Sequence, residues 1–146
     1  MNAMFDHPLV DAGQSNLSEA NPDWQQPFMS VEEQLQYKFL ICLEGNDVAS
    51  NLKWAMSSNS IVVTPKMRYE TWFMEGALEP GVHFIQVEDD WSDFEEKIRY
   101  YLDNPSESED IHLFNIHFLL KGCFHKLKKY PKDIVSGCEL GFIFSR

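Results

Sequence analysis

The sequence is poor in basic side chains. It has 12 Lys and Arg against 23 Asp and Glu, which gives a formal net charge of −11. A nucleic-acid-binding domain needs clustered Lys and Arg to neutralise phosphates, and an anionic membrane attracts proteins through the same side chains. The composition therefore argues against a nucleic-acid partner and a broad membrane-binding surface. The exception is residues 121–132, which hold five Lys and no acidic residue.

Cysteines and long apolar runs are also scarce. Cys42, Cys123 and Cys138 are odd in number and no two have Cys-x-x-Cys spacing, which argues against a disulfide framework and favours a reducing cytoplasm. Residues 1–13 lack a basic stretch followed by an apolar one, so no signal peptide is predicted. No run reaches the roughly 18 apolar residues of a membrane-spanning helix, and the nearest candidate, residues 111–120, is interrupted by polar side chains.

Glycine is absent from the positions that cofactor fingerprints require. The seven Gly form no Gly-x-Gly-x-x-Gly dinucleotide motif and no phosphate-loop Gly-Lys-Ser/Thr motif. No group of His and Cys has zinc spacing either. The sequence therefore predicts no cofactor and no metal ion. A metal site at Asp89, Asp90 and Asp93 is the less favoured alternative, because acidic side chains there also stabilise the start of a helix.

Hydrophobic residues make up 44% of the chain, which is enough for a folded core. Ser-x-x-Glu capping boxes at Ser30 and Ser92 mark two helix starts. The alternation of apolar runs and helical periodicity predicts an α/β fold with a Rossmann-like parallel sheet. The predicted elements are a helix over 31–36, strands over 38–43, 60–63 and 82–87, a helix capped by Asn46 or Asp47, a short helix over 69–74 and an amphipathic helix over 92–104. Three regions are predicted: an irregular lead-in over 1–30, the α/β domain over 31–107 and a tail over 108–146.

Residues 43–53, Leu-Glu-Gly-Asn-Asp-Val-Ala-Ser-Asn-Leu-Lys, are the segment that best suits a binding site. They combine a predicted strand end, a glycine-containing turn and a predicted helix start. Ligands of open α/β sheets bind beyond the carboxyl ends of strands, where a helix N-terminus offers N–H groups to an anion such as a diphosphate. By itself, however, one glycine in a turn is more typical of an ordinary strand-to-helix connection.

Several motifs in order over residues 5–107 resemble the family-90 glycosyltransferases. These include bacterial lipopolysaccharide-A-type enzymes, fungal capsule-associated enzymes and eukaryotic protein O-glucosyltransferases. The resemblance is closest to the bacterial branch, and its specificity comes from the number and order of the motifs. The matching segments are residues 7–11 (His-Pro-Leu-Val-Asp), 37–39, 43–47, 51–54, 56–60, 69–76 (Tyr-Glu-Thr-Trp-Phe-Met-Glu-Gly), 83–84, 91–97 and 103–105.

The resemblance implies a two-domain fold of the glycosyltransferase B (GT-B) type, with this chain similar to its C-terminal donor-binding half. It implies a nucleotide-sugar donor, expected to be a UDP-hexose, and transfer of the sugar to a hydroxyl of a lipid-linked or lipopolysaccharide glycan acceptor. It also implies a cytoplasmic location, with peripheral association at the inner face of the cytoplasmic membrane. The implied donor-binding residues are Gly45, Asn46, Asp47, Asn51, Lys53, Tyr69 and Glu70.

Each implied residue has an expected role. By resemblance, residues 45–47 face the donor diphosphate. The eukaryotic relatives carry an Arg at the position of Asn51 that engages the phosphates, so Lys53 is the cation that could substitute here. Tyr69 and Glu70 are expected near the ribose or base, because a carboxylate can bind both ribose hydroxyls.

Two departures from the family pattern leave a second hypothesis open. The acceptor-side domain, expected to supply the catalytic base, should precede residue 5, so the base is expected outside this chain. Residues 108–146 are rich in Phe, His, Lys and Cys and differ from the long helix expected there; a truncated or frame-shifted product would explain both departures. The alternative to a glycosyltransferase fragment is a non-catalytic α/β remnant or interaction module, which predicts exposed apolar surface and self-association.

Aromatic side chains and Cys42 have core roles as their simplest interpretation. Trp54 and Trp91 are expected in the core, while Trp72 is the surface candidate for stacking on a base or sugar. Cys42, inside a predicted buried strand, is expected to act as a small apolar residue.

Overall fold

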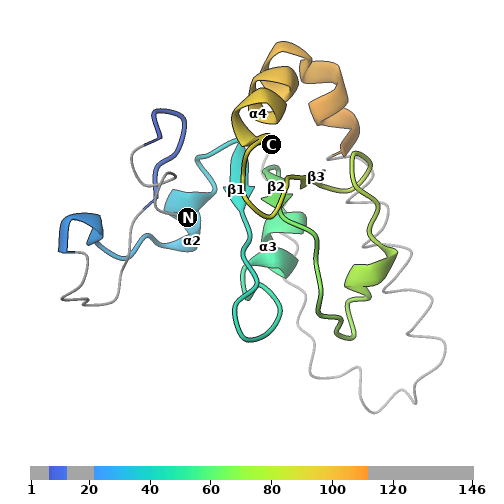
Figure 1. The fold of residues 1–146 in the computed structure, drawn as a ribbon, viewed down its shortest axis with the longest axis horizontal. Coiled ribbons are helices and arrows are strands. Elements are labelled where there is room, and N and C mark those ends of the chain that lie inside the picture. The colour runs from blue at the N-terminus through green and yellow to red at the C-terminus, as the bar shows by residue number, and fades with distance from the viewer. Residues whose placement is uncertain (1–6, 13–21, 112–146) are drawn as a thin grey trace.

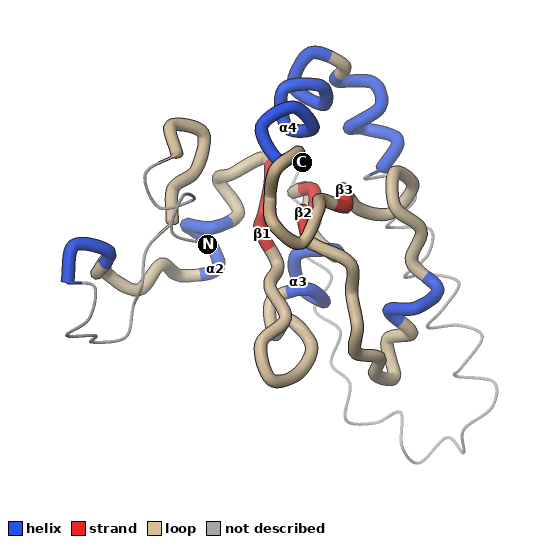
Figure 2. Tube along the Cα trace, in the orientation of Figure 1, coloured by secondary structure: helices blue, strands red, loops and turns tan. Residues whose placement is uncertain are grey.

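The structure is a computed structural model that describes residues 7–12 and 22–111. Short strands and helices alternate along these residues (Figures 1 and 2). Residues 112–146 of the predicted tail, with Cys123, Cys138 and the Lys-rich stretch, lie outside the described residues. The elements are η1 (Pro22–Trp24), α2 (Val31–Gln34), β1 (Phe39–Ile41), α3 (Leu52–Met56), β2 (Ile61–Thr64), η2 (Glu75–Ala77), β3 (Ile85–Gln86) and α4 (Phe94–Asp103), followed by a helical segment over 105–111.

The three strands form one parallel sheet in the order β1-β2-β3. Leu40 lies opposite Val62, and Val63 opposite Ile85. This confirms the predicted parallel α/β sheet, although each observed strand is shorter than or shifted from its predicted range. All four residues of β2 are buried, because this strand lies between two others and is covered on both faces. A continuous run of β-branched residues suits such a position.

Alternate side chains of the strands enter two separate cores. On one face, Leu40 and Val62 pack with Leu52 and Met56 around α3. On the other face, side chains of β2 and β3 pack with α4 and with the 105–111 segment, and this second core contains Ile61, Val63, Ile85, Val87, Phe94, Ile98 and Ile111. The result is three layers, with α3 and α4 on opposite faces of the sheet.

The helix after β1 begins later than predicted. Asn46 and Asp47 do not cap it, and α3 starts only at Leu52. The reason is local: the Asp47 carboxylate accepts the Val48 amide at 2.8 Å, and the Gly45 amide donates to the Asp47 carbonyl at 3.1 Å. Such short-range bonds compete with helical hydrogen bonds. Residues 43–50 therefore form a loop, visible in Figure 1 as the teal loop at the bottom of the view.

The predicted helix over residues 69–74 is wrong. Instead, residues 66–71 are irregular and a 3-10 turn forms at Glu75–Ala77. Met74 has a left-handed backbone with φ 60°, which a regular right-handed helix does not allow. The Thr71 amide donates to the Glu75 carboxylate at 2.7 Å, so a buried side chain organises this turn.

The predicted capping box at Ser92 and Glu95 is also wrong, although the helix itself is confirmed. The N-cap is Asp93, without a side-chain cap hydrogen bond. Its carboxylate accepts the Glu88 amide at 2.8 Å, and the Ser92 amide donates to Asp90 at 3.0 Å. The acids before α4 therefore close the β3–α4 loop on itself.

The other predicted capping box, at Ser30, is confirmed. The Glu33 amide donates to Ser30 Oγ at 3.3 Å, and the Ser30 amide donates to the Glu33 carboxylate at 2.7 Å. The helix ends at Gln34, two residues before the predicted end, and has no buried residue. With no buried side chain to extend it, α2 remains a single capped turn.

Pro105 marks the end of α4 as predicted, and it also begins the next helical segment. Proline suits a first helical position because its missing N–H would have no partner there. Ser108 and Ile111 on that segment are buried, so the packed structure continues past residue 107. Among the described residues, no helix has the length and apolar character needed to cross a bilayer.

Candidate functional site

Three loops meet beyond the carboxyl ends of the strands and are tied together by side chains. The Glu44 carboxylate, just after β1, accepts the amides of Arg68 and Tyr69 from the loop after β2, at 2.9 and 3.2 Å. The Arg68 guanidinium in turn donates to Asp89, after β3, at 2.5 Å. In an open α/β sheet this edge is where ligands bind, so the parallel order of the three strands marks it as the candidate site.

The loop after β1 presents the predicted Gly45, Asn46 and Asp47 to solvent. All three residues are exposed. A Cβ added to Gly45 would have no atom within 4 Å, so the protein itself leaves open space above this glycine. Within the described residues, neither the Asn46 nor the Asp47 amide donates a hydrogen bond. Two such amides without a partner among the described residues, beside an open glycine, are available to donate to an anion.

Asn51 joins the two ends of this loop through a side-chain hydrogen bond. Its side-chain amide donates to the Ile41 carbonyl at 3.0 Å. That carbonyl belongs to the last residue of β1, so the bond joins the strand end to the start of α3. The side chain at this position therefore fixes the loop's base.

Lys53 points from α3 to a buried carboxylate. Its Nζ lies 3.5 Å from Glu75 Oε1, and the Glu75 side chain is only 1% exposed. The same ammonium lies 5.9 Å from the ring centroids of Trp72 and Phe73. A buried carboxylate needs a counter-charge and hydrogen bonds to remain ionised, and Lys53 supplies the counter-charge.

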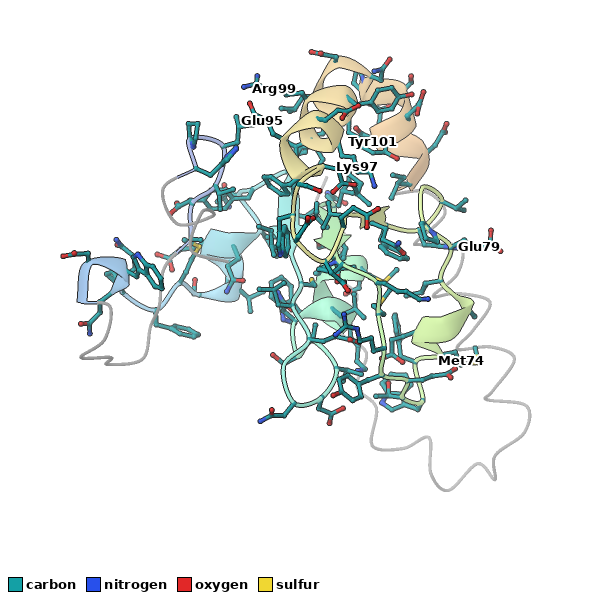
Figure 3. All side chains as sticks on the ribbon, in the orientation of Figure 1. Met74, Glu79, Glu95, Lys97, Arg99 and Tyr101 are labelled. Carbon is teal, nitrogen blue, oxygen red and sulfur yellow. The ribbon has the colours of Figure 1, made fainter. Side chains whose placement is uncertain are left out.

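The turn containing Glu75 supplies the hydrogen bonds. Thr71 donates both its amide and its Oγ1 hydroxyl to the carboxylate, each at 2.7 Å. Burial alone would raise the pKa of Glu75, but the bonds from Thr71 and the Lys53 charge hold this pKa below its ordinary value. Met74, labelled in Figure 3, adopts its left-handed conformation inside this closed turn.

Tyr69 and Glu70 lie next to Arg68, on the loop that Glu44 holds. Both are exposed, and Tyr69 is 43% exposed. The Glu70 carboxylate packs beside Gly76, where an added Cβ would lie 3.6 Å from it. Trp72 is 67% exposed, which confirms it as the surface tryptophan, whereas Trp54 packs against the core.

The acids after β3 have partners within the protein. Asp89 pairs with Arg68, and Asp93 pairs with Lys97 at 2.6 Å. Hydrogen bonds from Ser92 lower the pKa of Asp90. Burial opposes ionisation of Asp93, but bonds from Lys97 and from the Glu88 amide keep its pKa below the ordinary value. Among the described residues, no three metal-ligating side chains come together.

A cavity of about 350 Å³ lies elsewhere, at the outer edge of β3 against α4. Tyr101 and Lys97, both labelled in Figure 3, contribute to its wall. The Lys97 ammonium already has two partners within the protein, because it donates to the Gln86 carbonyl at 2.5 Å and pairs with Asp93. None of the seven predicted donor-binding residues lines this cavity.

The fold defines a class of protein: an α/β domain with a parallel sheet, whose loops after the three strands form the candidate site. Comparison with known proteins identifies the family. The sequence profile of glycosyl transferase family 90 matches residues 6–123, most of the chain. The chain therefore belongs to glycosyl transferase family 90. The match extends beyond residue 107, in line with the buried side chains after that point.

Similar proteins support the same family. The chain is 50% identical over 105 residues to the O-glucosyltransferase LpsA of Dichelobacter nodosus, covering 72% of this chain and 33% of that protein. It is 32% identical over 84 residues to protein O-glucosyltransferase 2 of Danio rerio, covering 57% of this chain and 16% of that protein. It is also 33% identical over 88 residues to the uncharacterized protein 027R of Frog virus 3, covering 57% of this chain and 9% of that protein. The chain thus spans about a third or less of these relatives.

Sequence reasoning missed Glu44, Arg68 and Glu75. Glu44 and Glu75 belong to segments that carried the family resemblance, yet their roles depend on partners 24 and 22 residues away. Arg68 directly precedes Tyr69, and its position just after a predicted strand was a usable signal. The sequence does not show which side chains of different loops pair with one another.

Proposed function

We propose that this chain is the donor-binding part of a GT-B-type glycosyltransferase. It binds a nucleotide sugar, of the UDP-hexose class, whose sugar is transferred to a hydroxyl of a lipid-linked or lipopolysaccharide glycan. The observation that carries the proposal is the edge formed by the three carboxyl-end loops, in a chain of family 90. The name of the bacterial relative, an O-glucosyltransferase, supports a hexose donor.

The proposed donor contacts follow from exposure and chemistry. The loop over residues 45–47 receives the diphosphate, since its residues are exposed and the amides of Asn46 and Asp47 have no partner among the described residues. Tyr69 offers a ring to the base, and the exposed carboxylate of Glu70 accepts hydrogen bonds from ribose hydroxyls. Asn51 and Lys53 act through other residues: they fix the loop base and the 71–75 turn.

The catalytic base is assigned to none of the described residues. Its expected place is the acceptor-side domain, so donor binding rather than turnover is the property to measure first. We further propose a cytoplasmic location at the inner face of the cytoplasmic membrane, where the proposed lipid-linked acceptor would be found. The proposed donor contacts do not depend on this location.

Calorimetric titration of the full chain with UDP, UDP-glucose and UDP-galactose tests the proposal, with ADP-glucose as the comparison for the base. We expect saturable binding of UDP and at least one UDP-sugar. Glu70→Gln and Tyr69→Ala should each weaken it about tenfold, the value of one charged hydrogen bond or stacking contact. The matched controls are Glu96→Gln and Tyr100→Ala on α4, whose side chains are exposed like those they match. No saturable heat with any UDP compound would remove the proposed donor site.

The second candidate is a non-catalytic interaction module, which a specific surface favours. Phe28 is 79% exposed, Val31 on α2 is 41% exposed, and Leu35, the C-cap of α2, is 40% exposed. Neighbouring apolar side chains of this kind often mark a surface that another domain covers. Sedimentation of the full chain separates the two candidates when combined with the titration. Self-association without UDP binding favours the module, and UDP binding by the chain excludes it as the sole function.

A further inference from the structure

Arg68 is a cation at the site edge whose charged group is largely in water and whose ion-pair partner follows another strand. Its side chain is 65% exposed, and it pairs at 2.5 Å with Asp89, which is 59% exposed. Exposed ion pairs contribute little to stability, because water solvates both charges well and the side chains lose entropy on pairing. The guanidinium can therefore exchange its partner at small cost.

The backbone of Arg68 is held beside the loop over residues 45–47. The Glu44 carboxylate accepts the amides of Arg68 and Tyr69 through its two oxygens. Glu44 directly precedes Gly45, so these bonds bring the start of one loop to within hydrogen-bonding distance of the other. The side chain of Arg68 thus starts from a backbone position that is held by the residue directly before the 45–47 loop.

Lys53, the cation that the sequence indicated, is engaged elsewhere. Its ammonium is the counter-charge of the buried Glu75 carboxylate. Moving it to a bound phosphate would leave that carboxylate buried without its cation, which is costly. Asn51 is neutral, and its side-chain amide donates to the Ile41 carbonyl. Neither Lys53 nor Asn51 therefore offers an uncommitted positive charge to a phosphate at this edge.

We propose that Arg68 binds the pyrophosphate of the donor and that Asp89 is the carboxylate it releases on binding. This inference rests on the proposed donor site and names its principal phosphate-binding residue. A pyrophosphate carries more charge than a carboxylate, and the planar guanidinium matches two phosphate oxygens with two parallel N–H bonds. In the ligand-free protein Asp89 holds the guanidinium near the strand ends; with ligand, Asp89 returns to water.

The exchange makes two substitutions act in opposite directions. Arg68→Gln removes the proposed phosphate contact and should weaken binding of UDP and of inorganic pyrophosphate about 10- to 100-fold. Asp89→Asn removes the competing carboxylate and one negative charge from the site, so binding of both should become several-fold tighter. Uridine, which has no phosphate, should be affected by neither change.

The chain supplies matched controls. Arg99 forms an exposed ion pair with Glu95 at 2.6 Å, with side chains 59% and 50% exposed. Figure 3 shows this pair on α4 at the top of the view, whereas the loop after β1 is at the bottom. Arg99→Gln removes the same charge from the same kind of pair at a distance. Lys66→Gln removes a positive charge from an exposed position on the Arg68 loop.

The experiment is calorimetric titration of the full chain and its variants with UDP, inorganic pyrophosphate and uridine at one ionic strength. Support requires weaker UDP and pyrophosphate binding in Arg68→Gln, with Arg99→Gln and Lys66→Gln within about twofold of the parent. Urea unfolding confirms that each variant is folded.

Each contrary result has a distinct meaning. If the parent binds UDP and Arg68→Gln binds it equally well, the role of Arg68 is wrong and the donor site stands. Weaker UDP binding in Asp89→Asn overturns the exchange, since Asp89 would then be needed to position Arg68. If the parent binds neither UDP nor pyrophosphate, the donor site and this inference fall together.

Discussion

Removing the buried charge at Glu75 should destabilise the protein more than any other single polar substitution near the site. The change is Glu75→Gln, which keeps the side-chain volume. Glu75 Oε1 accepts from Thr71 Oγ1 and Lys53 Nζ, and Oε2 accepts from the Thr71 amide. A glutamine has one oxygen, so its NH2 group must face one of these donors. One side of the glutamine amide therefore makes a donor–donor contact at a buried position.

The magnitude follows from the burial of each partner. Breaking a fully buried ion pair costs about 3–5 kcal/mol. Lys53 is 29% exposed, so its ammonium regains part of its hydration when the carboxylate is lost. We therefore expect Glu75→Gln to lower the free energy of unfolding by about 2–3 kcal/mol at neutral pH. Lys53→Met leaves the carboxylate buried with only its Thr71 bonds and should cost a comparable amount, about 2 kcal/mol.

The pH dependence gives an independent check of the same interaction. The pKa of Glu75 is lowered in the folded protein from an ordinary value of 4.5. The unfolded state then binds more protons in this range, so the stabilisation is fully present above pH 4.5 and is lost as the pH falls through the folded pKa below it. The difference in stability between the parent and Glu75→Gln should be constant from pH 7 to about 5.5 and should shrink below about 4.5.

The assay is urea unfolding of the full chain, followed by tryptophan fluorescence, with a double-mutant cycle for Lys53 and Glu75. Glu70→Gln is the control, because it removes an exposed carboxylate from the same loop and should change stability by less than about 0.5 kcal/mol. A Glu75→Gln variant within that same margin at pH 7, with no coupling to Lys53, would refute the buried ion pair.

Two further predictions concern the backbone and the buried thiol. Gly81 has φ 75°, so Gly81→Ala should lower the free energy of unfolding by about 1–2 kcal/mol in urea unfolding. Gly45 has open space at the Cβ and no positive φ, so Gly45→Ala should be neutral or slightly stabilising. Equal losses of stability in both variants would contradict the backbone assignment. Cys42, directly after β1, is fully buried, and desolvation raises its pKa to about 12. Peptide mapping after alkylation at pH 8 should therefore find this thiol modified only when urea is present. Rapid labelling of Cys42 in the folded chain would show that the end of β1 opens.

Several elements were predictable because their signals are local. The capping box at Ser30 involves residues three apart, and both of its hydrogen bonds form. The apolar run at residues 60–63 became the central strand, since β-branched side chains suit a position buried on both faces. The periodicity of α4 likewise placed Phe94 and Ile98 in the core.

Two errors have different causes. Residues 69–74 were predicted to form a helix, yet Glu75 is buried against Lys53, 22 residues away, and Thr71 donates to it in a turn. Ser92 and Glu95 have the spacing of a capping box, but the acids beside Ser92 accept backbone amides within the β3–α4 loop. A long-range contact outweighed the local preference in the first case, and competing short-range bonds did so in the second.

The sequence by itself determined the family, the parallel sheet and the segments that reach its carboxyl edge, because motif order and hydrophobic periodicity are properties of the chain read in one dimension. Only the tertiary structure decided which charged groups meet there. Glu44, Arg68 and Asp89 follow three different strands, and parallel pairing brings those strand ends to one edge. The same assembly buried Glu75 and so committed Lys53 to it, since the energy of a charge depends on its burial and its neighbours.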